Sequence, residues 1–158
     1  MARDASEPGR KIVARNRKAR HEYEILETLE AGIELKGPEV KSLRAGNVSF
    51  QDAHARVQRG ELWLHNVHIS PYSHRGYVSH EPLRRRKLLL NRAEIRKLTG
   101  KMVERGFTLV PVRMYFKNGR VKVAMSIAKG KKVHDKRETI RRREIDRETR
   151  ALVKERAR

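Results

Sequence analysis

Short runs of basic side chains are the feature of this sequence that could do chemistry. Four basic residues lie between Arg15 and Arg20, four more fill residues 84–87, and three lie within residues 129–132. Guanidinium and ammonium groups in such runs neutralise phosphates and release condensed counterions. The pattern therefore predicts binding to a nucleic acid, and the charge alone does not distinguish DNA from RNA.

Aromatic side chains, by contrast, are sparse. The chain has one Trp, four Tyr and three Phe. Proteins that bind single strands stack successive bases on aromatic rings, and this sequence has too few rings for an extended platform. We therefore expect recognition of a folded RNA through its shape and backbone.

The seven histidines raise the question of a metal site or of acid–base catalysis, above all at His54, His65 and His68. Residues three apart on a strand point to opposite faces, and no cysteine completes a ligand set. The chain also lacks a Gly-rich phosphate loop, a Gly-x-Ser-x-Gly elbow and a His-Glu-x-x-His pair. We expect no metal, no other cofactor and no enzymatic activity.

The charge is distributed over the whole chain. The 158 residues include 39 Lys or Arg and 19 Asp or Glu, a formal net charge of +20, of which +5 falls in residues 1–20, +9 in 21–130 and +6 in 131–158. Most large apolar residues lie in the central part. We therefore expect a flexible basic arm at 1–15, one RNA-binding barrel at 16–130 and a basic tail at 131–158. No apolar run exceeds three residues and no secretory signal is visible, so we expect a cytoplasmic protein without a membrane span.

Two hairpins are predicted from alternating apolar residues around short turns. The first turns at Asn118-Gly119, a preferred type I′ pair, and the second at Arg59-Gly60. Pro111 cannot donate a ladder hydrogen bond, so we expect an edge or a bulge there. The expected pairs are Phe116–Val121, Met114–Val123, Val112–Met125, Val110–Ile127, Val57–Leu62 and Ala55–Leu64.

Two short helices have clear start signals. The first follows Gly37-Pro38-Glu39 and should bury Val40 and Leu43. The second follows Asn91, should bury Ile95 and Leu98, and should stop near Gly100. The turn after it should pack Met102 and Val103. Several short strands with intervening helices predict a mainly β fold, an OB-fold-like antiparallel β-barrel, rather than a doubly wound sheet.

The tail combines helix formers with few apolar residues. Glu138–Arg142 and Asp146–Arg150 are pairs at i,i+4, and Ile145, Thr149, Leu152 and Val153 share one side. That apolar side is too narrow to dock firmly. We expect the free tail to be disordered and to form a helix against a polyanion.

Four ordered segments carry a resemblance to a known family. They are NRKARHEY at residues 16–23, EAGIELKGPEVKSLRAG at 30–46, RKLLLN at 86–91 and GKKVHDKR at 130–137. Through them the chain resembles the small protein B family, the SsrA-binding proteins that bind transfer-messenger RNA (tmRNA). The resemblance implies an OB-fold monomer that binds the tRNA-like domain of tmRNA and acts in trans-translation, the rescue of stalled ribosomes.

The resemblance also implies separate tasks for the barrel and the tail. The barrel would bind the tRNA-like domain, and the tail would enter the empty mRNA channel near the small-subunit decoding centre to license accommodation and peptide tagging. The implied partners are alanyl-tmRNA with elongation factor Tu and both ribosomal subunits. His54 and Ser126 depart from the family pattern, which often has an aromatic residue and a glycine there.

Candidate site residues follow from the resemblance and from the basic runs. Glu30 could accept hydrogen bonds from bases or ribose, or order Lys41 and Arg44, while a buried structural ion pair is the alternative. Leu89 could pack on a base or lie in the core. Asn91 could contact RNA or cap a helix, and Asp135 could cap a helix that starts near Lys136. The RNA-binding set is His21, Glu30, Lys41, Arg44, Lys87, Leu89, Asn91, Lys129, Lys131 and Lys132, and the ribosome-binding set is His134, Asp135, Lys136, Arg137, Arg141 and Arg142.

A second hypothesis fits the composition equally well. A structural ribosomal protein, or an OB protein like an initiation factor, would bind ribosomal RNA without handling a delivered RNA. The four motifs favour the first hypothesis over this one.

Overall fold

The computed structural model describes residues 9–72, 80–103, 106–131 and 133–157, with the backbone alone described at 133–135. The elements, in chain order, are β1 (Arg10–Arg15), α1 (Arg17–Glu22), β2 (Tyr23–Ile33), α2 (Gly37–Arg44), β3 (Val48–Ser49), β4 (His54–Gln58), β5 (Glu61–His65), β6 (His68–Ile69), β7 (Arg86–Leu89), α3 (Arg92–Met102), β8 (Phe107–Lys117), β9 (Arg120–Gly130) and α4 (Val133–Arg156).

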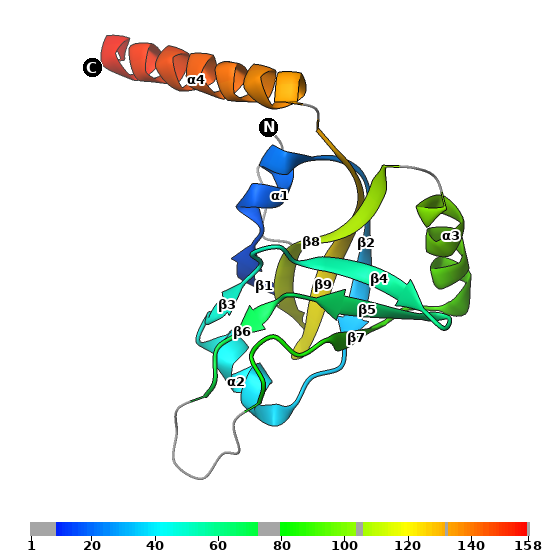
Figure 1. Cartoon of the computed structure of the whole chain (residues 1–158). Coiled ribbons are helices and arrows are strands. Elements are labelled where there is room, and N and C mark those ends of the chain that lie inside the picture. The colour runs from blue at the N-terminus through cyan, green and yellow to red at the C-terminus, as the bar shows by residue number, and fades with distance from the viewer. Residues whose placement is uncertain (1–8, 73–79, 104–105, 132, 158) are drawn as a thin grey trace.

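The long strands close into an antiparallel ring (Figure 1). From β8 the paired neighbours are β4, β5, β7, β2 and β9, and β9 pairs again with β8. β1 adds to the edge of β8, and β3 pairs with β6 in a small separate sheet. α1 lies at one end of the barrel and α2 at the other, with α3 along one side. The expected mainly β, OB-like architecture is confirmed.

Every second side chain along the strands points into the barrel interior and fills it. Leu62 on β5 pairs with Leu88 on β7, and both are almost fully buried. Val123, Met125 and Ile127 of β9 are buried in the same cluster. Side chains at the intervening positions face the outer side of the sheet. On β9, Ala124, Ser126 and Ala128 are buried there, whereas Arg120 is exposed.

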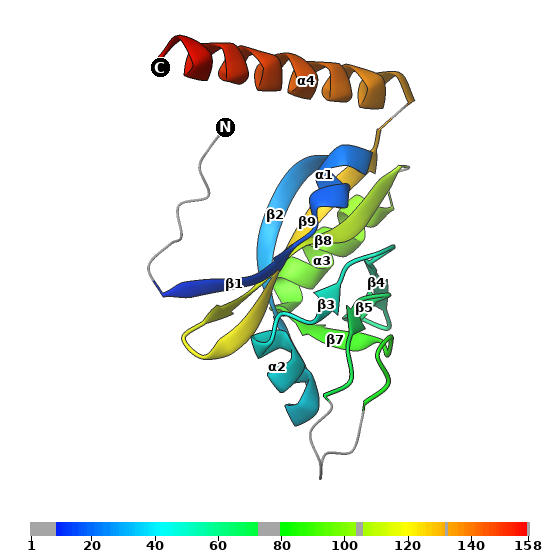
Figure 2. The ribbon, with the colours of Figure 1, turned by 90° about the vertical axis from the view of Figure 1, so that its left-hand side faces the viewer.

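The expected flexible arm at 1–15 is wrong for its last six residues. Arg10–Arg15 form β1, which pairs with residues 113–117 of β8 (Figure 2). Val13 and Ala14 pack against the core, and the Asn16 side chain donates to the Pro111 carbonyl at 2.8 Å. The free edge of β8 supplies the hydrogen-bond partners that this short apolar stretch needs to form a strand. Residues 1–8 lie outside the described residues.

Both hairpins form at the predicted turns. Asn118 and Gly119 have φ of 50° and 75°, as a type I′ turn requires. Of the expected pairs, Phe116–Val121, Met114–Val123, Val57–Leu62 and Ala55–Leu64 are confirmed.

The other two expected pairs, Val112–Met125 and Val110–Ile127, are wrong. The register shifts between Pro111 and Arg113, so Met125 pairs with Pro111 and Ile127 with Leu109. Val112, between Pro111 and Arg113, is the extra residue of a β-bulge, which was expected at Pro111.

The predicted helices begin where expected and differ in what they bury. In α2, Leu43 is buried, but Val40 is only half-buried and the fully buried partners are Glu39 and Ser42. Glu39 is buried because arginines neutralise it, as described below.

α3 continues beyond the expected stop. It runs through Gly100 to Met102 because glycine weakens a helix without ending it. Leu98 is buried and Ile95 half-buried, whereas Val103 is 80% exposed and does not pack.

α4 extends away from the barrel next to α1 (Figures 1 and 2). Its connection to the body is Lys131, whose backbone N–H donates to the Glu22 carbonyl at 3.0 Å. Lys131 Nζ donates to the Arg20 carbonyl at 3.1 Å and to Thr139 at 3.2 Å. The structure therefore has the tail as a helix. The expected disorder of the free tail stays a prediction.

Candidate nucleic-acid interface

One outer face of the barrel is strongly cationic. The register places Arg10 beside Lys117, and Gly32 between Lys122 and Leu89. Outward residues of neighbouring strands share this face, here called the cationic wall: Arg10, Glu30, Leu89, Arg113, Lys117, Arg120 and Lys122. With five cations and one acid among these seven residues, the wall can attract RNA phosphates.

Glu30 lies in the centre of the wall. The Tyr115 hydroxyl and Lys117 Nζ, the latter at 3.2 Å, donate to its carboxylate, and the Arg10 guanidinium is 3.6 Å away. Burial raises the pKa of Glu30, but these donors and charges outweigh burial and lower the pKa below its usual 4.5. Burial and the Glu30 carboxylate raise the pKa of Tyr115 to about 12. At neutral pH the pair is a carboxylate and a neutral phenol.

α2 carries Lys41 and Arg44 away from the wall. Lys41 Nζ lies 5.5 Å from the centroid of the Tyr72 ring, and Arg44 is exposed. The expectation that Glu30 orders these two cations is wrong, because the donors to Glu30 come from β1 and β8. Lys41 and Arg44 form a separate basic zone at the α2 end of the barrel.

Leu89 is on the surface, which excludes its reading as ordinary core. Its side chain is 50% exposed, and it lies over Gly32, where an added Cβ would come within 3.2 Å of the Leu89 Cβ. Gly32 thus permits Leu89 to lie flat against β2. Glu30 and Leu89, far apart in sequence, are neighbours on the wall.

An open groove of about 740 Å³ begins at Leu89. Lys87, Arg92 and Arg96 line it together with Leu89 and Ile95. Lys87 also pairs with Glu61 at 3.0 Å. A lining that combines apolar and cationic side chains suits an unstacked nucleotide, whose base is apolar on its faces and whose phosphate is negative.

Asn91 has the helix-capping role that the sequence allowed. Its backbone N–H donates to the Glu94 carboxylate at 3.0 Å in a capping box at the start of α3. Asn91 is exposed as well, and it lies between Leu90 and Arg92, which both line the groove.

The remaining predicted RNA contacts lie at the α1 end. His21 is half-buried on α1, Lys129 is exposed near the end of β9, and Lys131 ties α1 to the tail. Seven residues along β2 separate Glu30 from Tyr23, a distance of roughly 23 Å. The structure therefore does not bring His21, Lys129 and Lys131 to the wall, and Lys132 lies outside the described residues.

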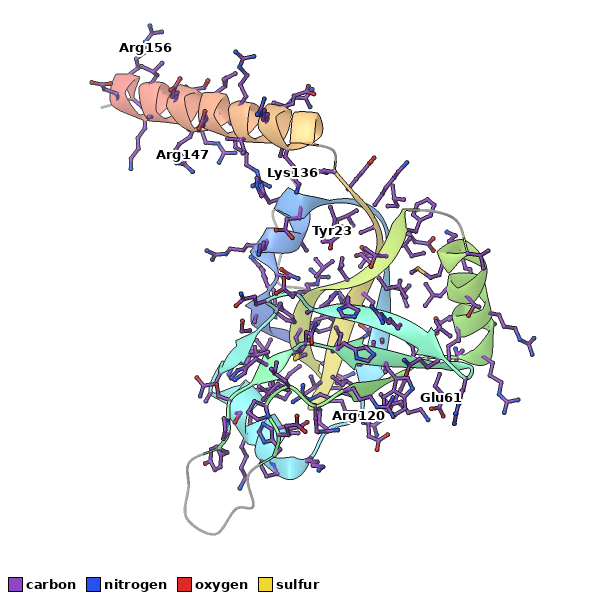
Figure 3. All side chains as sticks on the ribbon, in the orientation of Figure 1. Tyr23, Glu61, Arg120, Lys136, Arg147 and Arg156 are labelled. Atoms are coloured by element: carbon purple, nitrogen blue, oxygen red, sulfur yellow. The ribbon has the colours of Figure 1, made fainter. Side chains whose placement is uncertain are left out.

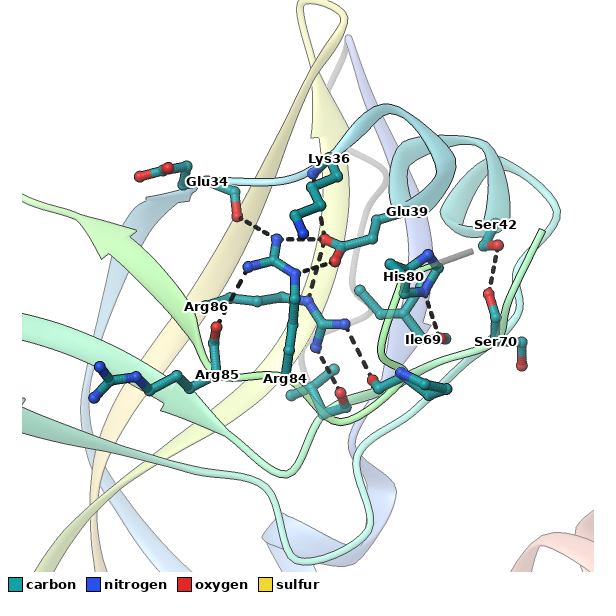
Figure 4. Close-up of polar contacts among 12 residues, drawn as sticks. Glu34, Lys36, Glu39, Ser42, Ile69, Ser70, His80, Arg84, Arg85 and Arg86 are labelled. Atoms are coloured by element: carbon teal, nitrogen blue, oxygen red, sulfur yellow. Dashed lines mark hydrogen bonds and ion pairs between the residues drawn. The ribbon is translucent and has the colours of Figure 1, made fainter. Parts of the chain in front are cut away.

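The run at residues 84–87 is only partly available to phosphate. Arg86 is fully buried, and its Nε donates to Glu39 Oε2 at 3.2 Å (Figure 4). Arg86 also donates to the carbonyls of Val67 at 2.7 Å and Pro82 at 3.1 Å, and Arg84 forms a two-pronged pair with Glu39. These two arginines hold α2 on the barrel, so they are structural rather than phosphate-binding residues.

Arg85 of the same run is exposed and lies over an aromatic ring. Its guanidinium lies 4.5 Å from the Trp63 ring centroid and donates to Gln58 at 3.1 Å. On the same outer face, His54 stacks on His65 with ring centroids 5.3 Å apart. The second departure from the family pattern, Ser126, is buried and shares a hydrogen bond of 2.7 Å with Thr28.

The tail presents its charge around a whole helix (Figure 3). Arg137, Arg141 and Arg142 are exposed and Lys136 is half-buried, and Arg142 donates to Glu138 at 3.1 Å, as predicted. α4 begins at Val133, so Asp135 lies in its first turn instead of at the expected cap. The side chains of His134 and Asp135 lie outside the described residues.

Sequence reasoning missed Arg10, Arg113, Tyr115 and Lys117 as part of a site. The signal was present: Arg113, Tyr115 and Lys117 alternate with apolar residues in the strand predicted before Asn118. Sequence reasoning did not predict that β2 pairs with β9 and β9 with β8. This pairing brings the three β8 residues near Glu30.

Comparisons with known proteins show the family of this chain. The family model described as SmpB protein matches residues 13–155. The chain belongs to the SmpB family. It is similar to the SsrA-binding protein of Synechococcus elongatus, 55% identical over 95% of this chain and 98% of that protein. The SsrA-binding protein of Desulforudis audaxviator is 58% identical over 91% of this chain and 94% of that protein.

A solved structure extends the similarity to three dimensions. It is described as "tmRNA-SmpB: a journey to the center of the bacterial ribosome", and it is 52% identical with a TM-score of 0.68, covering 82% of this chain and 94% of that chain. The family comprises RNA-binding proteins, not enzymes. In the part of the chain that the structure describes, no helix has the length and apolarity to cross a membrane, and no three His, Cys, Asp or Glu side chains group as metal ligands.

Proposed function

We propose that this chain binds the tRNA-like domain of tmRNA through the cationic wall and the Leu89 groove, and brings it to stalled ribosomes. The single observation that carries the proposal is the surface that combines five cations with an exposed leucine above Gly32. Membership of the SmpB family, relatives named SsrA-binding protein and a neighbour described as tmRNA-SmpB support the same RNA.

The cationic wall, the α2 end and the α1 end of the barrel each contact a different part of the RNA. The wall and groove bind the tRNA-like domain through phosphates and one unstacked base. Lys41 and Arg44 at the α2 end contact its backbone beyond the wall. His21, Lys129 and Lys131 lie where the barrel meets the tail, and with Lys132 they would contact the same RNA. The RNA would arrive as alanyl-tmRNA together with elongation factor Tu.

The tail has the second task. Its exposed arginines and its few contacts with the barrel suit insertion into a groove of ribosomal RNA. We propose that residues 131–158 occupy the empty mRNA channel near the decoding centre and license accommodation and peptide tagging. His134, Asp135, Lys136 and Arg137 would be the first to contact the small subunit, followed by Arg141 and Arg142.

Replacing Leu89→Ala tests the groove. We expect the Kd for the tRNA-like domain to rise about five- to tenfold, because the variant loses the apolar area that a base would cover. The melting temperature should hardly change, since half of this side chain is already exposed. Fluorescence anisotropy with labelled RNA measures the Kd.

Leu26→Ala is the matched control. Leu26 lies on β2 as well and is 51% exposed, but it is outside the wall and the groove. The control should bind with the affinity of the unchanged chain. Equal Kd values for both variants would show that Leu89 does not contact the RNA.

A further inference from the structure

Both carboxylate oxygens of Glu30 have partners within the chain itself. One oxygen accepts from Lys117 Nζ at 3.2 Å, and the other accepts from the Tyr115 hydroxyl and faces Arg10 Nη2 at 3.6 Å. Two of the roughly four acceptor positions of a carboxylate are therefore occupied by hydrogen bonds within the protein. These contacts give Glu30 a role in holding its neighbours that does not require it to accept from a base.

Tyr115 fixes the arrangement from below. It is 2% exposed, and its ring has the Arg10 guanidinium 5.1 Å and the Arg113 guanidinium 5.5 Å from its centroid. Both arginines are therefore anchored on the same ring by cation–π contacts. A buried ring on a central strand gives them a rigid support.

Cations outnumber carboxylates in the described part of this cluster. Arg10 and Lys117 lie beside the Glu30 carboxylate, and Arg113 lies over the same Tyr115 ring as Arg10. The side chains of Arg10, Glu30 and Lys117 are 23%, 32% and 37% exposed, so they remain accessible to a ligand. The ligand chemistry that matches preorganised cations with shared support is a phosphate group.

We propose that Arg10, Arg113 and Lys117 form a binding site for a backbone phosphate of the RNA, with Glu30 and Tyr115 as positioning residues. The proposal rests on the proposed function, because the phosphate belongs to the tRNA-like domain. Glu30 holds the Arg10 and Lys117 side chains at a fixed separation. Less side-chain entropy is therefore lost when the phosphate binds. Arg10 thereby makes β1 part of the RNA interface.

A double-mutant cycle tests the positioning role. Lys117→Met and Arg10→Met should each raise the Kd for the tRNA-like domain on the order of threefold to tenfold. Each should also make the slope of log K against log salt shallower by about 0.7 to 0.9, the value of one phosphate contact. Glu30→Gln should raise the Kd as well, although it removes a negative charge.

The combination separates positioning from direct contact. If Glu30 acts through the cations, Glu30→Gln should have almost no further effect in the Arg10→Met/Lys117→Met background. Effects that add in full, or a Glu30→Gln variant that binds more tightly, would overturn the proposal. Tyr115→Phe, which keeps the ring but removes the hydroxyl donor, should weaken binding less than Glu30→Gln, and a larger loss would also count against it.

Lys11→Met is the control for charge alone. Lys11 is exposed on β1 next to Arg10 but outside the cluster, so its replacement should leave the Kd within about twofold and the salt slope nearly unchanged. An equal effect of Lys11→Met would mean diffuse charge, not a built site. Failure of the unchanged chain to bind the tRNA-like domain would instead refute the proposed function.

Discussion

A chain that ends at Gly130 should bind the tRNA-like domain nearly as tightly as the intact chain and should support no peptide tagging. The barrel closes through pairs that all lie before residue 131, so its fold and the cationic wall do not need the tail. The truncation removes Lys131 and Lys132 at the edge of the RNA surface and the long-range attraction of α4, which salt screens. Because the wall and the groove remain, we expect the Kd to rise by less than about threefold at physiological salt. Binding is measured by anisotropy, and tagging in a reconstituted system with ribosomes stalled at the end of a message.

A charge-matched comparison locates the effect within the tail. Lys136→Ala/Arg137→Ala removes two cations from the start of α4, and Lys154→Ala/Arg156→Ala removes two from its end. We expect the first pair of changes to reduce tagging by more than tenfold, and the second by only a few-fold. Loss of RNA affinity on truncation, or equal effects of the two pairs, would contradict the division of tasks between barrel and tail.

Replacing Glu39→Gln should lower the free energy of unfolding by about 3–5 kcal/mol at pH 7, because it leaves Arg86 buried without its counter-charge. Gln keeps the shape of the side chain but cannot neutralise the guanidinium. Urea denaturation followed by circular dichroism measures the change. Glu34→Gln is the control, since the Glu34 carboxylate is exposed and only its backbone carbonyl accepts from Arg84.

The effect of Glu39→Gln should depend on pH. Burial raises the pKa of Glu39, but hydrogen bonds and charge from Arg84 and Arg86 outweigh it and lower the pKa below 4.5. A lowered pKa in the folded state stabilises the fold above pH 4.5 and loses this contribution as pH falls through the lowered value. The difference between the two chains should therefore shrink towards pH 3, and a difference independent of pH would contradict the ion pair.

Local chemistry explains which parts of the fold were predictable. Asn118-Gly119 and Arg59-Gly60 set their hairpin registers within a few residues, and Asn91 with Glu94 set the start of α3. Each of these signals consists of residues that are close together in the sequence, so no tertiary contact is needed to recognise it.

Tertiary partners explain what sequence reasoning missed. β1 is a strand only because the edge of β8 is free to pair with it, and α1 depends on the Asn16 side chain, which bonds both to Ala19 and across to Pro111. Sequence reasoning assigned Glu39 to a helix start and Arg86 to a phosphate-binding run. It missed their ion pair because each is buried only in the presence of the other. The site had the same limit: Glu30 and Leu89 were identified through the family resemblance, while the cations around Glu30 come from strands paired far apart in sequence.

The measurement that tests the central claim most directly is competition between the tRNA-like domain of tmRNA and bulk tRNA for the intact chain. At physiological salt we predict a Kd in the nanomolar range for the tRNA-like domain and binding to bulk tRNA that is at least about 100-fold weaker. Equal affinity for the two RNAs would contradict the account and would favour a general binder of structured RNA, such as a ribosomal protein.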